Sequence, residues 1–297
     1  MTAQHPIFLE FTHFKGEAPA GFERDFIGSV SRPWFWGGPP RDAAIEVDVP
    51  HPAFDEEYFE WIDLLESVAA ARDSYTMIEL GAGYGRWAMR AALAVRQLSA
   101  MPFHLIAVEA DPVHFDWLCM NFEDNGLDPN QHTLIQAAVG GAPGEASLWV
   151  ASNESRHSPG LWYGQMVLDK QRAKPLKDAN YGGYPVHRHK DGRKWITVPQ
   201  VDIESILRNS PRVDLVDLDV QFQELEAIAP AIGELNAKVK RLHIGTHSTE
   251  IEVGLRTLLA RNGWVCLADY PGRGIRETPW GKIDFDDGVQ SWLNPRV

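Results

Sequence analysis

The sequence has few cysteines and no long apolar run. Only Cys119 and Cys266 occur in 297 residues, and neither belongs to a CxxC pair, so we expect neither a disulfide framework nor a zinc site of that kind. No stretch approaches the ~18 uninterrupted apolar residues of a membrane span. The N-terminus also lacks the basic start and apolar run of a signal peptide. We therefore expect a cytoplasmic protein that does not interact with a membrane.

Basic residues are also scarce, because 28 Lys and Arg face 41 Asp and Glu for a net charge of −13. A protein that tracks phosphates normally has a stripe of positive charge, so nucleic acid is a poor candidate partner. The exception is the segment 170–194, with eight Lys or Arg against two acids. Either it is a solvated loop, or it attracts an anionic or polyhydroxylated acceptor. His187 and His189 lie nearby without a third ligand at a recognised spacing, so no metal site is assigned.

Hydrophobic residues make up 44% of the chain, an ordinary globular value. Apolar runs alternate with amphipathic stretches, which predicts an α/β fold with a doubly wound, mostly parallel sheet. The final segment, Val289–Leu293, suits an antiparallel last strand. The other strands are expected at 76–80, 103–109, 132–139, 213–220, 241–246 and 264–269.

Two parts of the chain stand apart from this alternation. Residues 1–75 form an aromatic-rich N-terminal arm followed by a predicted packing helix at 54–72, and residues 76–297 form the main domain. The arm either covers that domain or places Trp34–Trp36 over a substrate. The main domain carries an inserted loop region around 152–195.

The first strand of the main domain ends in an acid, Glu79, and then three glycines, Gly81, Gly83 and Gly85, precede a helix. Glycine permits positive φ and close approach of a ligand to the backbone, and the helix N-terminus presents free amides. The dinucleotide fingerprint GxGxxG requires its third glycine at position 86, which is Arg86. The pattern therefore favours a nucleotide-like cofactor other than NAD.

The next two strand ends supply further candidate cofactor contacts. Glu109 ends the second strand, where a carboxylate takes both hydroxyls of a ribose. Asp111 is the alternative if Glu109 points away. Ala110 lies beside Glu109, and Ala137 and Ala138 lie near the end of the third strand, where small residues leave room for a flat ring.

Polar residues also end the fourth and fifth strands. Asp217 and Asp219 are two residues apart and share one face of a strand, at the end of the sheet where ligands bind in such folds. Buried carboxylates are costly unless they are paired or bound to a cation, but two of them are too few to assign a metal. His247 follows the fifth strand beside Asp219 and is the candidate base, whereas His243 is expected to be structural.

The acid-x-GxGxG pattern resembles motif I of class I S-adenosylmethionine-dependent methyltransferases, and residues 76–297 are similar to the FkbM family. That resemblance is carried by residues 79–85, 137–140, 217–221 with Glu224, 244–248 and, weakly, 291–295. The family usually has glycine where this chain has Phe222. The resemblance implies a Rossmann-like fold, S-adenosyl-L-methionine as cofactor, and O-methylation of a sugar or a secondary metabolite. Cofactor contacts are then expected from Glu79, Gly81, Ala82, Gly83, Gly85, Glu109, Ala110, Ala137 and Ala138.

The expected reaction is methyl transfer to a hydroxyl group of a small molecule. His247 would take the proton of the acceptor, and Asp219 would orient the imidazole and raise its basicity. Two other functions remain open. A non-catalytic binding module would keep the cofactor fold without turnover, and a nicotinamide-dependent oxidoreductase is disfavoured by Arg86.

Overall fold

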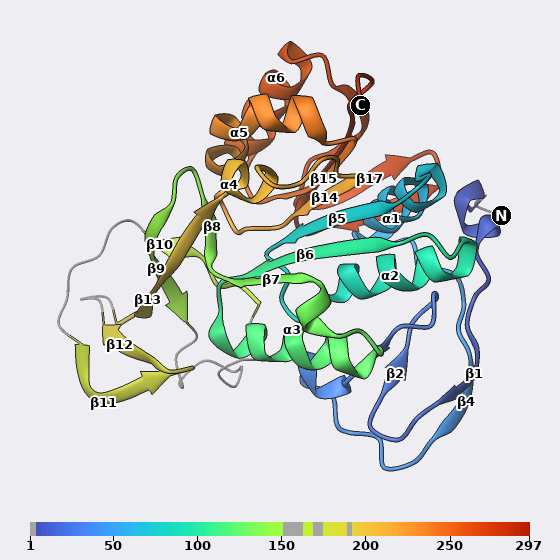
Figure 1. Ribbon diagram of the computed structural model, residues 1–297, viewed down its shortest axis with the longest axis horizontal. Helices are drawn as coiled ribbons and strands as arrows, with labels where there is room; N and C mark the ends of the chain where they lie inside the picture. The colour runs from blue at the N-terminus through green and yellow to red at the C-terminus, as the bar shows by residue number, and fades with distance from the viewer. Residues whose placement is uncertain (1–3, 151–162, 169–174, 189–191) are drawn as a thin grey trace.

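A seven-stranded sheet forms the centre of the computed structural model (Figure 1), which describes residues 4–150, 163–168, 175–188 and 192–297. The strand order is β16-β19-β15-β14-β5-β6-β7. Strand β19 runs antiparallel to both β15 and β16, and the remaining neighbours are parallel. This confirms the doubly wound, mostly parallel sheet with an antiparallel last strand. The strands are β5 (Tyr75–Leu80), β6 (Phe103–Glu109), β7 (Thr133–Gln136), β14 (Leu215–Leu218), β15 (Arg241–Thr246), β16 (Val265–Tyr270) and β19 (Gly288–Leu293).

Helices cover both faces of this sheet, because successive strand residues point to opposite sides and both sides are apolar. Met77 and Leu105 pack with α1, α2 and α3, whereas Ile78 and Ile106 pack with α4, α5 and α6. In Figure 1, α4 to α6 lie above the sheet and α2 and α3 below it. Among the described residues, no helix is both long enough and apolar enough to cross a bilayer. The helices are α1 (Tyr58–Ala70), α2 (Arg86–Leu98), α3 (Pro112–Asp124), α4 (Ile203–Leu207), α5 (Glu224–Lys238) and α6 (Thr249–Arg261).

The packing helix begins four residues later than its apolar pattern predicted, at Tyr58 rather than at residue 54. Asp55 accepts a hydrogen bond from the amide of Glu57 (3.1 Å), which closes a turn before the helix. Glu57 then pairs with Arg86 and Arg90 of α2. Of the acids before α1, Glu57 therefore contacts a neighbouring helix, and all three lie before the first turn of α1.

The third predicted strand, 132–139, is divided into two. Strand β7 belongs to the central sheet, whereas β8 (Ala138–Gly140) pairs with β13 (Lys194–Asp202) in a second sheet. Ala137 lies at the break, and its amide donates to the carbonyl of Glu109 (3.0 Å). The single apolar run 132–139 thus passes from one sheet to the other. Its hydrophobic periodicity does not reveal this break.

The second sheet has six strands in the order β10-β9-β13-β12-β11, with β8 attached to β13. Its other strands are β9 (Gly144–Val150), β10 (Val167–Leu168), β11 (Pro175–Tyr181) and β12 (Tyr184–Arg188). The described parts of the predicted insertion are therefore largely strands. Residues 151–162, 169–174 and 189–191, which include His189 and part of the basic segment, lie outside the described residues.

The N-terminal arm folds into short ribbons and 3-10 turns that pack on the main domain. Phe8 and Phe35 are fully buried; Phe8 packs against Tyr58 of α1, and Phe35 stacks on Tyr84 of the glycine turn. Trp36 remains 52% exposed. The arm consists of η1 (Pro6–Glu10), β1 (Lys15–Ala18), β2 (Glu23–Arg24), β3 (Val30–Ser31), η2 (Pro33–Trp36) and β4 (Ile45–Asp48). A hairpin of β17 (Gly274–Thr278) and β18 (Gly281–Phe285) joins β16 to β19.

Candidate functional site

A cavity of about 290 Å³ lies at the carboxyl ends of β5, β6, β14 and β15, where ligands bind in open α/β sheets. The N-terminal arm, the segment before α1 and the second sheet complete its wall. The lining is strongly acidic, with Arg86 as its one Arg or Lys among the described residues. The acidic lining residues are Glu56, Glu57, Glu60, Glu79, Glu109, Asp217, Asp219 and Asp287.

The glycine turn forms one side of the cavity, and its three glycines all have positive φ, at 83°, 55° and 72° for Gly81, Gly83 and Gly85. A Cβ on Gly81 would lie 1.8 Å from the backbone oxygen of Asp219. A Cβ on Gly85 would lie 2.3 Å from a methyl group of Leu118 in α3. Glycine is therefore required here both by conformation and by the close approach of β14 and α3.

Glu79 connects the end of β5 to the helix that follows this turn. Its carboxylate accepts hydrogen bonds from the amides of Trp87 (3.2 Å) and Ala88 (2.9 Å) in the first turn of α2. The residue that precedes α2 is Gly85, which has no side chain to cap these amides. Burial, with the charge of Asp217 adding to it, raises the pKa of Glu79 to about 8.

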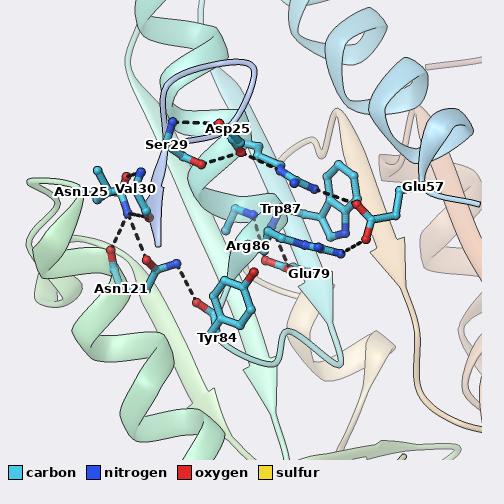
Figure 2. Close-up of polar contacts among 12 residues, drawn as sticks. Asp25, Ser29, Val30, Glu57, Glu79, Tyr84, Arg86, Trp87, Asn121 and Asn125 are labelled. Carbon is cyan, nitrogen blue, oxygen red and sulfur yellow. Dashed lines mark hydrogen bonds and ion pairs between the residues drawn. The ribbon is translucent and has the colours of Figure 1, made fainter. Parts of the chain in front are cut away.

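Arg86 occupies the position where a dinucleotide fold has its third glycine, and it is the first residue of α2. Its guanidinium pairs with the carboxylate of Glu57 (Figure 2). It also lies over the rings of Trp36 (5.1 Å) and Trp87 (5.4 Å). The arginine therefore links the glycine turn to the acids before α1 and to the N-terminal arm.

Figure 2 shows how the arm and α3 fix the same region. Asp25 accepts a hydrogen bond from Arg90 of α2 (2.9 Å). The backbone of Val30 exchanges two hydrogen bonds with the side chain of Asn125. Asn121 of α3 donates to the backbone carbonyl of Tyr84 in the glycine turn (2.9 Å). The turn is thus held from segments on both sides of it in the sequence.

Glu109 lies at the end of β6, lines the cavity and is 7% exposed. Its two oxygens accept hydrogen bonds from the amides of Gly83 and Asp111, each at 2.6 Å. Burial raises its pKa to about 8. A carboxylate has about four lone-pair positions, so Glu109 retains acceptor capacity toward the cavity.

The neighbours predicted with Glu109 divide between the cavity wall and the protein interior. Ala110, Ala137 and Ala138 line the cavity, as does Ala82 of the glycine turn. Asp111, the alternative to Glu109, is fully buried and caps α3 through the amides of Val113 and His114. It also accepts hydrogen bonds from Gln165 (3.1 Å) and Tyr181 (2.8 Å), so its role is structural.

Asp219 and His247 lie side by side, at the ends of β14 and β15. His247 Nε2 is 3.3 Å from Asp219 Oδ1, and Nδ1 is 2.6 Å from Glu224 Oε1. Asp219 lines the cavity, whereas the described wall does not include His247, which is 7% exposed. Burial disfavours the charged ring, but the hydrogen bond to Glu224 and the charge of Asp219 raise the pKa of His247 to about 9.

Phe222, where the family usually has glycine, keeps a backbone that suits glycine. Its φ is 71°, and that of Gln221 is 40°, both in the left-handed region that disfavours side chains. Its amide donates to Glu224 Oε1 (3.1 Å), and its ring lies 5.5 Å from that of His247. The loop after β14 thus places Glu224 against His247 with a strained residue at its bend.

Sequence reasoning did not assign several of the lining residues to the site, among them Glu60 of α1, Tyr163 and His243, which was expected to be structural. Tyr163 donates to the carbonyl of Phe35 (2.7 Å) and stacks on His114. No local pattern marks Glu60 or Tyr163, because distant segments bring them to the cavity. The pairing of His243 with Asp217 on the same face of the sheet became apparent only from the register of β14 and β15.

Comparison with known proteins gives a consistent picture. Residues 79–256 match the methyltransferase FkbM domain. A protein of Jannaschia sp. (strain CCS1), named as a candidate methyltransferase, is 26% identical over 239 residues, which cover 80% of this chain and 79% of that protein.

Solved structures similar to this chain include two methyltransferases. The methyltransferase FkbM of Methylobacillus flagellatus KT is 13% identical, with a TM-score of 0.43, over 76% of this chain and 45% of that one. The precorrin-6y C5,15-methyltransferase of Geobacter metallireducens GS-15 is 11% identical, with a TM-score of 0.41, over 78% of this chain and 85% of that one.

Proposed function

The chain belongs to the methyltransferase FkbM domain family, and from this premise we propose that it transfers the methyl group of S-adenosyl-L-methionine to a hydroxyl oxygen of a small molecule, a sugar or a secondary metabolite. One observation carries the proposal. The same cavity is lined by the glycine turn and Glu109 and, next to the turn, by Asp219. A cofactor and an acceptor can therefore meet inside it.

The residues of the glycine end suit this cofactor. The sulfonium and the amino group of S-adenosylmethionine are cationic and favour the ionised forms of the acids in the wall, of which Glu79 and Glu109 are buried. Glu109 has acceptor capacity left for ribose hydroxyls. The small side chains of Ala137 and Ala138 leave space for a flat ring. When bound, the cofactor supplies a methyl group that its sulfonium has already activated.

The protein then has to hold the acceptor in line with that methyl group and take up its proton. The sequence pointed to His247 as the base, but the described cavity wall does not include His247, and its pKa of about 9 favours the protonated ring at neutral pH. We therefore assign the proton of the acceptor to the carboxylate of Asp219, which lines the cavity. His247 positions Asp219 from behind, and Glu224 in turn holds His247. The acceptor oxygen gains the methyl group as its proton passes to Asp219.

The acidic wall also supports the choice of acceptor class. Phosphates would be repelled by it, and the chain carries a net charge of −13, so we expect neither nucleic acid nor an anionic membrane as substrate. Hydroxyl groups, by contrast, donate hydrogen bonds to carboxylates. A neutral, hydroxyl-bearing small molecule is therefore the substrate class that fits the cavity.

The test begins with calorimetric titration of S-adenosylhomocysteine and, separately, of NAD. We expect binding of the former and none of the latter. Incubation of the protein and isotopically labelled S-adenosylmethionine with a panel of sugars and other polyols should then give a product with the label on oxygen, identified by mass spectrometry.

Three outcomes would contradict the proposal at different points. Binding of NAD without binding of S-adenosylhomocysteine would remove the methyltransferase assignment of the cavity. Binding of S-adenosylhomocysteine without labelled product from any hydroxyl compound would instead indicate a binding module. A label on nitrogen or carbon would retain methyl transfer and reject the hydroxyl acceptor.

A further inference from the structure

A row of polar residues crosses the central sheet beneath α1. In the strand register, Asp217 of β14 lies opposite Glu79 of β5 on one side and opposite His243 of β15 on the other. Residues in register point to the same face. Helix α1 covers this face and adds Glu60 and Asp63 to the row. Such a concentration of carboxyl groups under a helix is costly in the ionised form unless bound protons or positive charge compensate it.

His243 is oriented by a carboxylate on its far side. Its Nδ1 is 2.8 Å from Asp63 Oδ2, and Asp63 also accepts hydrogen bonds from Arg241 (2.6 Å) and Ser291. With Nδ1 committed to Asp63, Nε2 is the ring atom left for a ligand. A histidine that donates one ring N–H to a carboxylate is the usual arrangement behind a metal-binding imidazole.

Glu60 and Asp217 face each other on the cavity side of His243. One ligand atom from each of the three residues lies within 4.8 Å of the other two, and all three line the cavity. Asp217 is only 5% exposed, and its Oδ1 accepts no hydrogen bond from any described residue. The half-buried Glu60 and the buried Asp217 therefore bring two carboxyl groups together at the cavity.

The neighbouring cluster of Asp219, Glu224 and His247 differs because its histidine pairs with members of the cluster, whereas His243 pairs with Asp63 outside its own cluster. There the imidazole lies between the two carboxylates, at 2.6 Å from Glu224 and 3.3 Å from Asp219. The charged ring itself supplies the positive partner. The two clusters have the same residue types, so the second serves as a natural comparison for the first.

We propose that Glu60, Asp217 and His243 bind a divalent first-row transition-metal cation. Two carboxylate oxygens and one imidazole nitrogen are ligands that Zn²⁺ and similar ions accept, and two carboxylates match the charge of a divalent ion. Three protein ligands leave a coordination position open toward the cavity, as in catalytic rather than structural metal sites. Cation binding goes beyond the proposed methyl transfer and does not depend on it.

The test uses Co²⁺ as a spectroscopic probe of the purified, chelator-treated protein, without cofactor or acceptor. We expect one equivalent of Co²⁺ to give visible absorption bands, Zn²⁺ to displace it, and azide to change the bands by entering the open position. Glu60→Gln and Asp217→Asn should each weaken Co²⁺ binding about 100-fold or more, since loss of an outer-shell partner alone costs ~10–100-fold. Both variants remove a like charge, so their melting temperatures without metal should equal or exceed that of the native protein.

The double variant Asp219→Asn/His247→Gln is the matched control, and it should bind Co²⁺ as the native protein does. Three results would overturn the site: no Co²⁺ binding to the native protein, binding that survives in folded Glu60→Gln and Asp217→Asn, or binding lost only in the control. If azide does not change the absorption bands, the bound metal has no open coordination position. Binding of S-adenosylhomocysteine is measured in the same samples, so failure of the cofactor site is distinguishable from failure of the cation site.

Discussion

At the scale of single residues, the site combines groups whose charges are set by their surroundings. Asp219 faces the cavity with a carboxylate, whereas His247 lies behind it and is held by Glu224. An exposed acid and a buried, protonated histidine are suited to different tasks. The acid can receive a proton from the cavity, and the imidazolium can stabilise its ionised form.

We expect Asp219→Asn to lower kcat by about 100- to 10,000-fold, the usual contribution of a general base. Affinity for S-adenosylhomocysteine should remain within about threefold, because Glu109 and the glycine turn are unchanged. Labelled methyl transfer and calorimetry measure the two quantities. Full activity of Asp219→Asn would rule out this carboxylate as the proton acceptor.

His247→Gln should have a smaller effect of a different kind. The imidazolium favours the ionised form of Asp219, so its loss should raise the pKa of Asp219. The acid limb of the kcat profile should therefore move to higher pH, which a purely structural residue would not cause. An unshifted profile with activity lost as completely as in Asp219→Asn would contradict the positioning role.

Phe222 allows a prediction about stability. A left-handed backbone destabilises a residue with a side chain by about 1–2 kcal/mol relative to glycine. Glycine offsets about 0.5–1 kcal/mol of this difference, because it loses more conformational entropy on folding. Phe222 is 42% exposed, so its ring contributes little by burial. Phe222→Gly should raise the free energy of unfolding by about 0.5 kcal/mol, measured by urea titration. A marked loss of stability would show that the contact with His247 outweighs the strain.

At the scale of elements, the glycine turn is built by contacts from both neighbouring strands. Gly81 and Gly126 both have positive φ, but a Cβ on Gly126 would meet nothing within 4 Å, whereas one on Gly81 would strike the backbone of Asp219. Alanine substitutions at these two glycines therefore separate two free-energy costs. Both positions have the cost of the left-handed conformation, and only Gly81 adds the cost of a steric clash.

Gly126→Ala should cost about 1–2 kcal/mol, the left-handed penalty alone. Gly81→Ala should cost about 2–5 kcal/mol, because overpacking adds about 1–3 kcal/mol. It should also abolish cofactor binding, since the end of β14 must move. Chemical denaturation of both variants measures the difference. Equal losses would show that the turn can relax away from β14.

The local sequence pattern predicted most of the glycine turn but few of its contacts with distant segments. The strand, the acid and the three glycines follow from Glu79 to Gly85 alone, because each depends on backbone geometry within a few residues. The contact of Arg86 with Glu57 joins residues 29 positions apart. The break at Ala137 arises because β8 pairs with a strand some 60 residues later. Periodicity carries no information about such distant partners.

At the scale of the whole molecule, the buried titratable groups set a pH dependence of stability. The pKa values of Glu79 and Glu109 rise from 4.5 to about 8 on folding, and that of His247 rises from 6.5 to about 9. In each case the folded protein binds more protons than the unfolded chain. The stability of the ligand-free protein should therefore fall as pH rises from about 4.5 to 9.

Calorimetric melting between pH 5 and 9 measures this directly, and the melting temperature should decline steadily. Glu109→Gln should flatten the part of the curve below pH 8, because it removes one of the two acids. Saturating S-adenosylhomocysteine should stabilise the protein more at pH 8 than at pH 6, since hydroxyl donors favour ionised Glu109. A melting temperature that rises with pH would contradict the burial of these acids.

The alternation of strands and helices in the sequence predicted the overall architecture, but it did not predict which residues line the cavity. The family match begins at residue 79, whereas Trp36, Glu57 and Glu60 line the cavity from outside it. Their positions depend on how the arm and α1 pack, which single-sequence patterns do not encode.

The N-terminal arm therefore has a consequence for how relatives of this protein should be compared. A chain trimmed to the family-matched residues would lack one wall of its binding chamber and the hydrogen bond from Arg90 to Asp25. Relatives that share the common domain yet differ in their leading 75 residues would present different chambers to the acceptor. Selectivity can thus diverge through a region that a comparison restricted to the shared domain leaves out.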